Sequence, residues 1–272
     1  MNAPPPDLAS PPSPAPIWRF ATAGAIGGLA SGMFGVGGGI VMVPLLIWLG
    51  RLDQRRAAAT SLAAIIPTAL VGAAGYGFNG RLEIGPAAVI AAGAMAGAWA
   101  GARLLRTIKL ATLNWVFVGL IAATAVAMAF FQPQRGPAPA MGAAAWAGLA
   151  ALGLAMGLAA GLFGIGGGII AVPALMAIFG FSDLAARGTS LLVMVPSAVA
   201  GSITNHQGGL VAWRPAMATG LTAAAAALAG GGLAVLIAPR AGNLLFAGLL
   251  AVTAVQLSIR AARAARAARA GS

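Results

Sequence analysis

The chain has no cysteine, one histidine and four acidic residues, Asp7, Asp53, Glu83 and Asp183. Without cysteine there can be no disulfide, thiolate metal site or thiol redox chemistry, and one histidine gives almost no support to a transition-metal centre. The acids lie in the tail or in connections, so no Ser/His/Asp set forms, and the glycine-rich stretches lack the Gly-Lys-Ser/Thr ending of a P-loop. We therefore expect neither an enzyme nor a cofactor or metal.

Charge of either sign is scarce. Charged residues make up 7% of the chain, against about 25% in soluble domains, and the mean hydropathy is +0.93. Apolar runs of about 20 residues between short connections predict an all-α, polytopic integral membrane protein. These runs cover residues 17–50, 57–78, 84–102, 110–131, 140–180, 188–206, 216–238 and 243–259.

The two halves of the chain repeat each other. Gly-Met-Phe-Gly-Val-Gly-Gly-Gly at 32–39 matches Gly-Leu-Phe-Gly-Ile-Gly-Gly-Gly at 161–168, and the same repeat alignment pairs Pro44 with Pro173 without a gap. Secondary transporters are often built from such repeats, with the substrate site at the repeat interface. We predict two repeats of about four helical segments each. The predicted divisions are a Pro-rich disordered tail 1–16, repeat 1 at 17–131, a linker 132–139, repeat 2 at 140–259 and a basic tail 260–272 that continues as a helix.

The first segment of each repeat, 17–50 or 140–180, is too long for one helix. Thirty-four helical residues would reach about 51 Å, against a hydrocarbon core of about 30 Å. Each segment is interrupted by glycines, so it is either one broken span or a re-entrant hairpin. Broken spans divide the 16 basic residues equally between the two sides, whereas hairpins place about three quarters on one side, a positive-inside pattern. This favours inverted repeats with both termini in the cytoplasm of a bacterial-type inner membrane.

The net charge of +12 comes mostly from arginines in connections and in the C-terminal tail. In a soluble protein this charge would suggest nucleic acid. Beside membrane spans, basic loops set orientation and contact anionic lipid headgroups. We therefore expect lipid and a small anion as partners, and no nucleic acid; a homo-oligomer is an open alternative.

The glycine-rich breaks are the leading candidates for a binding site. Irregular backbone at membrane depth must face protein or a wet cavity, and the positive end of the helix that follows suits an anion. Close packing or a tight turn is the alternative. Hydroxyls at the start of the next segment could donate to an anion or cap that helix, and the Asn-His pair near the end of the 188–206 run breaks the repeat. The candidate substrate-binding residues are Gly35, Gly37, Gly38, Gly39, Thr60, Ser61, Gly164, Gly166, Gly167, Gly168, Thr189, Ser190, Asn205 and His206.

The doubled motif, with Pro44 or Pro173 after the glycines and Thr-Ser-Leu further on, resembles the sulfite exporter TauE/SafE family of the TSUP superfamily. The resemblance covers residues 24–258. It implies about eight spans and the transport, often export, of sulfite, thiosulfate, sulfoacetate or other sulfonates. It also implies that the glycines of both breaks and the two Thr-Ser pairs lie at positions of the family motif.

The residues themselves also favour an anion. A cation site in a membrane would include an acid, and no carboxylate lies inside an apolar run. Proton coupling would then need His206 or the substrate, or transport would be uniport. Two alternatives stay open: a passive pore, distinguished by flux without saturation, and a membrane scaffold that moves nothing.

Overall fold

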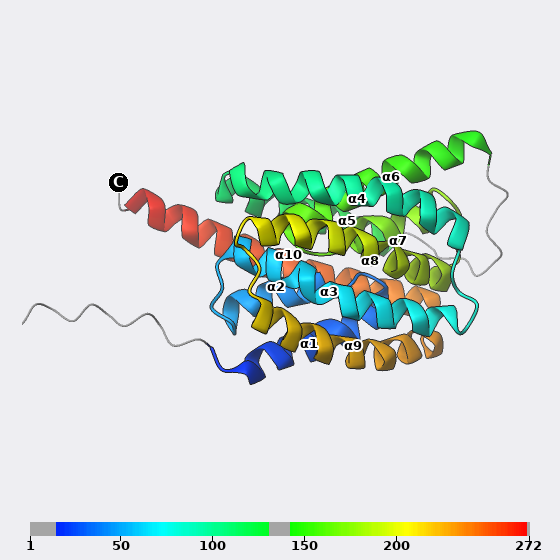
Figure 1. Ribbon diagram of the computed structural model, residues 1–272, viewed down its shortest axis with the longest axis horizontal. Helices are drawn as coiled ribbons and strands as arrows, with labels where there is room; N and C mark the ends of the chain where they lie inside the picture. The colour runs from blue at the N-terminus through cyan, green and yellow to red at the C-terminus, as the bar shows by residue number, and fades with distance from the viewer. Residues whose placement is uncertain (1–14, 131–141, 271–272) are drawn as a thin grey trace, which may run out of the picture.

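The computed structural model describes residues 15–130 and 142–270, and all regular secondary structure in these ranges is helical (Figure 1). The helices are α1 Ile17–Phe34, α2 Gly39–Trp48, α3 Gln54–Gly77, α4 Ile84–Thr107, α5 Leu110–Phe130, α6 Ala143–Phe163, α7 Gly168–Ala177, α8 Asp183–Gln207, α9 Trp213–Leu236 and α10 Pro239–Ala270. Among the described helices, α3–α6 and α8–α10 are long and apolar enough to cross a membrane. The prediction of an all-α, multi-pass membrane protein is confirmed.

Within the described residues each half contains five helices, because the glycine break divides the first of its four predicted segments in two. In the first half, α1 ends at Gly35, whose φ of 72° is left-handed. The chain then turns back, and the guanidinium of Arg19 at the start of α1 donates to the carbonyl of Leu49 at the end of α2 (3.4 Å). The segment is therefore a hairpin that begins and ends on one side of the bundle.

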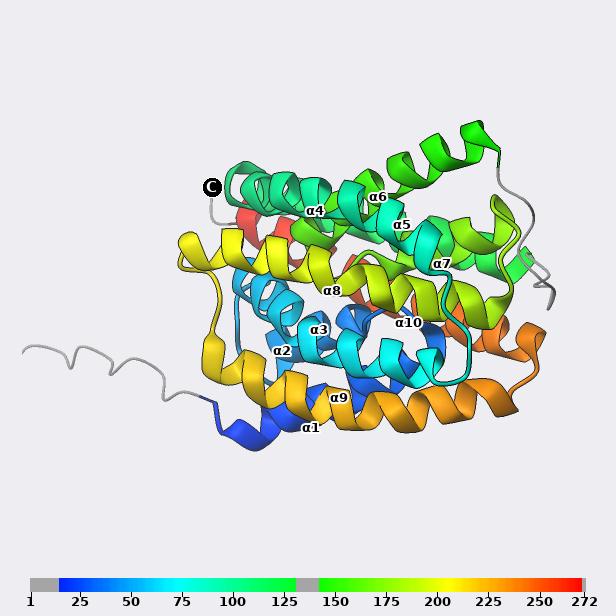
Figure 2. The same cartoon turned by 45° about the vertical axis from the view of Figure 1, so that its right-hand side comes forward.

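The helices form two lobes that do not coincide with the two halves of the sequence. The first lobe contains α1, α2, α3 and α9, and the second contains α6, α7, α8 and α4. Figures 1 and 2 show α1 beside α9 along the lower edge and α4 beside α6 along the upper edge. The lobes meet where α3 packs against α8, while α5 packs against α10. Each lobe thus takes its fourth helix from the other half of the chain.

Rows of glycine bring the paired edge helices into backbone contact. A Cβ added at Gly28 of α1 would lie 2.2 Å from the carbonyl oxygen of Ala223 in α9, and one added at Gly97 of α4 would lie 2.2 Å from that of Leu154 in α6. Small residues at membrane helix interfaces allow this close approach, which replaces the hydrophobic driving force that lipid cannot supply.

Equivalent helices of the two halves run in opposite directions. The backbone N–H of Ala212, just before α9, donates to the hydroxyl of Thr60 near the start of α3 (3.1 Å). The backbone N–H of Glu83, just before α4, donates in the same way to Thr189 near the start of α8 (3.1 Å). The repeat alignment pairs Thr60 with Thr189 and Glu83 with Ala212, so the two hydrogen bonds are equivalent. The start of α8 therefore lies at the end of the bundle where α3 finishes.

One end of the bundle is rich in tryptophan and basic side chains. The exposed tryptophans near this end are Trp18, Trp48, Trp99, Trp115 and Trp213. The guanidinium of Arg103 lies 3.8 Å from the centre of the Trp99 ring, and Arg55 donates to the carbonyl of Ile108 (2.8 Å). Tryptophan and arginine together are typical of a membrane–water interface. This is the end that the charge pattern predicts to be cytoplasmic; that orientation stays a prediction. Helix α10 continues through Ala270.

Candidate functional site

The two glycine breaks meet where the lobes face each other. A Cβ added at Gly39 would lie 2.5 Å from the carbonyl oxygen of Gly164, and one added at Gly168 would lie 2.6 Å from the Cα of Val36. Every residue of 35–39 and 164–168 is buried. The first turns of α2 and α7 therefore converge in the protein interior, and the backbones are already in contact in this conformation.

The other glycines of the breaks pack just as closely. Gly37 and Gly166 both face the sulfur of Met194, with added Cβ atoms 2.7 and 3.0 Å from it. Gly38 has a φ of 72° and lies against the carbonyl of Gly27 in α1, which would be 2.2 Å from an added Cβ. Close packing therefore accounts for these glycines. A binding role for backbone N–H groups of the breaks stays a prediction.

The paired hydroxyls divide into two kinds. Thr60 and Thr189 accept the bonds from the connections before α9 and α4 described above, so they position backbone. Ser61 and Ser190 are fully buried, and within the described residues their hydroxyls have no hydrogen-bond partner. A buried hydroxyl without a partner calls for a ligand or a water, so the serines are the members of each pair that fit a binding role.

Capping of their own helices does not explain these hydroxyls. The N-cap of α3 is Asp53, whose carboxylate accepts from the backbone N–H groups of Arg55 and Arg56. The N-cap of α8 is Ser182, which accepts from Ala185. The Thr-Ser pairs lie further along each helix.

The structure separates Asn205 from His206. Asn205 is fully buried, and neither its side-chain nitrogen nor its oxygen has a partner among the described residues. His206 is exposed, and its Nδ1 accepts a hydrogen bond from the indole N–H of Trp213 (3.0 Å). His206 therefore lies at the surface end of α8, and only Asn205 is turned into the protein.

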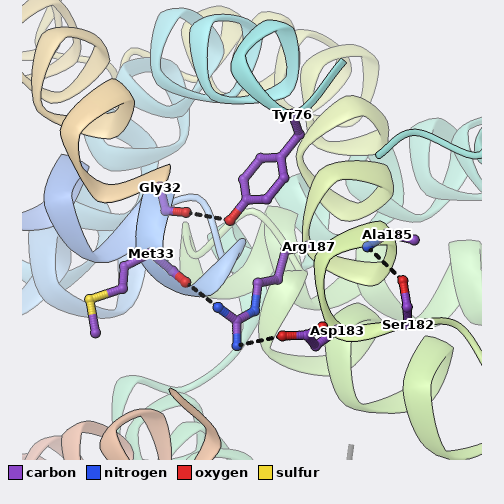
Figure 3. A network of polar contacts seen from close by, with 7 residues as sticks. All are labelled: Gly32, Met33, Tyr76, Ser182, Asp183, Ala185 and Arg187. Carbon is purple, nitrogen blue, oxygen red and sulfur yellow. Dashed lines mark hydrogen bonds and ion pairs between the residues drawn. The ribbon is translucent and has the colours of Figure 1, made fainter. Parts of the chain in front are cut away.

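A buried arginine was not singled out by the sequence. Arg187 lies in the first turns of α8, and its Nη1 donates to the carbonyl of Met33 (2.7 Å) near the end of α1 (Figure 3). Tyr76, also buried, donates to the carbonyl of Gly32 (2.8 Å). Together they satisfy the last carbonyls of α1. The repeat alignment could have revealed Arg187, since it pairs this charged residue with the uncharged Ala58.

Asp183 requires a correction. The sequence placed it in a connection, but it is the first residue of α8 and is completely buried. Its Oδ2 lies 4.0 Å from Nη2 of Arg187 (Figure 3). A basic partner one turn away and the positive end of α8 together stabilise the buried carboxylate. Because this acid is buried, proton coupling is no longer restricted to His206 or the substrate.

A cavity of about 770 Å³ lies between α3 and α9, away from the glycine breaks. Leucines and glycines make up half of its lining, and Tyr76, Asn79 and Arg81 are also part of it. Tyr76 therefore lies between this cavity and the arginine network. Among the described residues, no group of three or more His, Cys, Asp or Glu side chains could hold a metal ion.

Comparison with known proteins gives one consistent answer. The family model described as "Sulfite exporter TauE/SafE" matches residues 2–128 and 149–271. "Probable membrane transporter protein YunE" of Bacillus subtilis is 29% identical over 219 residues, which cover 72% of this chain and 80% of YunE. A "Probable membrane transporter protein" of Xylella fastidiosa is 29% identical over 227 residues, or 80% of this chain and 83% of that protein. No solved structure matches significantly. The chain belongs to the sulfite exporter TauE/SafE family of membrane transporters.

Proposed function

We propose that this transporter moves a small anion, such as sulfite, thiosulfate or a sulfonate, out across a bacterial-type inner membrane by alternating access. The observation that carries the proposal is the convergence of α2 and α7. Their positive N-terminal ends meet in a buried region where the backbones of the breaks are in contact. Two positive helix ends without water repel each other, and an anion between them removes that cost.

The anion is held by backbone N–H groups of the breaks and by the hydroxyl of Ser190 on one side of them or of Ser61 on the other, since Gly72 packs on Leu191 and Gly201 on Leu62. These serines are buried and have no partner in the described part of the chain. Asn205 adds an uncharged amide toward the opposite end from Arg187. The contact between the breaks is then a closed arrangement, and movement of one lobe against the other opens the site to each side in turn.

The topology belongs to the same proposal. The repeats are inverted, both termini face the cytoplasm, and the basic end with its tryptophans rests on anionic headgroups. The opposite directions of α3 and α8 support it.

The test is anion flux in proteoliposomes that contain the full chain. Flux of sulfite, thiosulfate or methanesulfonate should saturate, and the same anion should raise the thermal stability of the purified protein. Ser61→Ala and Ser190→Ala should each weaken anion binding about tenfold, the usual effect of losing a hydrogen bond to a charged group. Ser197→Ala is the matched control, because this buried hydroxyl already donates to the carbonyl of Met194 (3.1 Å).

The alternatives give different results. Flux that rises linearly with anion concentration identifies a passive pore. Absence of both flux and stabilisation identifies a scaffold. Unchanged binding in both serine variants, with binding by the wild type intact, would place the site away from the Thr-Ser pairs.

A further inference from the structure

We propose that Arg187 is the charged contact for the anion, and that the bound anion takes the place of the Asp183 carboxylate beside its guanidinium. This inference rests on the proposed function and adds to it a residue that is neither a glycine of the breaks nor a member of a Thr-Ser pair. It also assigns a role to Asp183, the buried acid that competes with the substrate.

Arg187 lies directly against the first glycine break. A Cβ added at Gly35 would lie 2.5 Å from the Cα of Arg187, so the break passes over this turn of α8. The guanidinium extends toward the end of α1, where it donates to Met33, and a Cβ added at Gly242 in α10 would lie 3.0 Å from its Nη2. Helices α1, α8 and α10 therefore enclose a positive charge beside the proposed site.

The chemistry of the pair fits an oxyanion. A guanidinium presents five N–H donors in a planar fork that binds carboxylate, phosphate and similar groups through two oxygens. Sulfite, thiosulfate and sulfonates offer two or more oxygens in the same way. The Asp183 carboxylate, with 4.0 Å between Oδ2 and Nη2, already occupies this side of the guanidinium. A buried arginine is costly unless it is paired with a negative charge. The Asp183 carboxylate can therefore move away from the guanidinium only when the substrate anion takes its place.

Two buried hydroxyls on the helices that Arg187 joins supply an independent observation. Ser190 lies three residues after Arg187, on the same face of α8, and Ser31 lies in the last turn of α1 close to Met33. Both serines are completely buried, and both hydroxyls are without a hydrogen-bond partner among the described residues. An anion that has left water requires neutral donors as well as a positive charge, and these two helices offer both.

The opposite end of the site has no equivalent charge. The repeat alignment places Ala58 opposite Arg187, Gln54 opposite Asp183 and Asn205 opposite Tyr76. The two repeats therefore form an asymmetric site, in which only the end formed by α1 and the start of α8 holds the anion by charge.

The experiment measures anion affinity by calorimetry on the full-length protein in detergent, with sulfite, thiosulfate and methanesulfonate as probes. Arg187→Gln should weaken affinity about 10- to 100-fold, the range for charged hydrogen bonds. Asp183→Asn should strengthen affinity several-fold, because it removes the competing carboxylate and leaves the guanidinium in place. Arg106→Gln is the matched control: its guanidinium also donates to a helix carbonyl, that of Thr204, but the residue is exposed at the other end of the bundle.

Opposite changes in the two variants separate this role from a structural one. If Arg187 only braces α1, both variants lower the melting temperature and leave the affinity unchanged, which overturns the inference while the proposed function stands. If wild-type protein neither binds nor transports any anion of the panel, the proposed function itself fails. Should Arg187→Gln not fold, Asp183→Asn decides alone, and an affinity equal to or below that of the wild type overturns the inference.

Discussion

Replacing Gly39 with alanine should force the two glycine breaks apart. The added methyl group would lie 2.5 Å from both the carbonyl oxygen of Gly164 and the Cα of Ile165. Both neighbours are backbone atoms of a buried loop, so neither can turn aside. Ordinary carbon contacts need about 3.5 Å or more, so the lobes must separate locally by roughly 1 Å.

The energetic effect follows from the packing. Overpacking a closed interior costs about 1–3 kcal/mol, and alanine in the first turn of α2 returns less than about 1 kcal/mol of helix propensity. A net penalty of about 1–2 kcal/mol falls only on the arrangement with the breaks in contact. The ratio of open to closed molecules should therefore rise about 5- to 30-fold.

The absence of cysteine makes this measurable without background. A single cysteine replaces the buried Ser61, and its rate of modification by a small soluble thiol reagent is compared with and without Gly39→Ala. The rate should rise by the same factor as the open population. Gly119→Ala is the control, since an added Cβ at Gly119 meets nothing within 4 Å. An unchanged rate in a protein of normal melting temperature would show that the contact between the breaks does not limit access to the serines.

Three further outcomes are expected. Reporters fused after Arg55 and after Phe181 should lie on opposite sides of the membrane; finding both on one side would restore parallel repeats. Gly97→Val should lower stability by about 1–3 kcal/mol, because its Cβ would lie 2.2 Å from the carbonyl oxygen of Leu154; a melting curve like that of the wild type would contradict this packing. Removing residues 260–272 should leave vesicle transport largely intact, whereas complete loss in folded, inserted protein would give the tail a direct role.

The regular parts of the fold could be predicted because apolar length and the repeat act locally. The run at 84–102 became α4, and the glycines at 35–39 fixed the position of the first break. The exchange of α4 and α9 between the lobes could not be predicted, since it depends on which glycine faces meet in space. A single sequence shows that such faces exist and does not show their partners.

Prediction of the site was limited by buried polar groups. Thr60 and Ser61 are neighbours in one motif, yet one hydroxyl is used by a distant backbone N–H and the other is not. Asp183 and Arg187 looked like loop charges because each alone belongs outside the membrane. Their i,i+4 spacing at the start of α8 permits both to be buried. The sequence shows this spacing, but it does not show that the helix begins at Asp183.

If one lobe moves against the other as proposed, the crossed pairing of the helices determines where the chain must bend. The first lobe is continuous with the second through residues 78–83, and the return crossing runs through residues 208–212. The threonine bonds fasten the far side of each crossing to its new lobe. Gly80 and Gly209 lie within these crossings at equivalent positions of the two repeats, with φ values of 63° and 66° and no neighbouring atom within 4 Å of an added Cβ. We therefore expect these two glycines to be the hinges of the proposed movement. The bodies that move would then be the two lobes, each completed by a helix from the other half of the chain, and not the two sequence repeats.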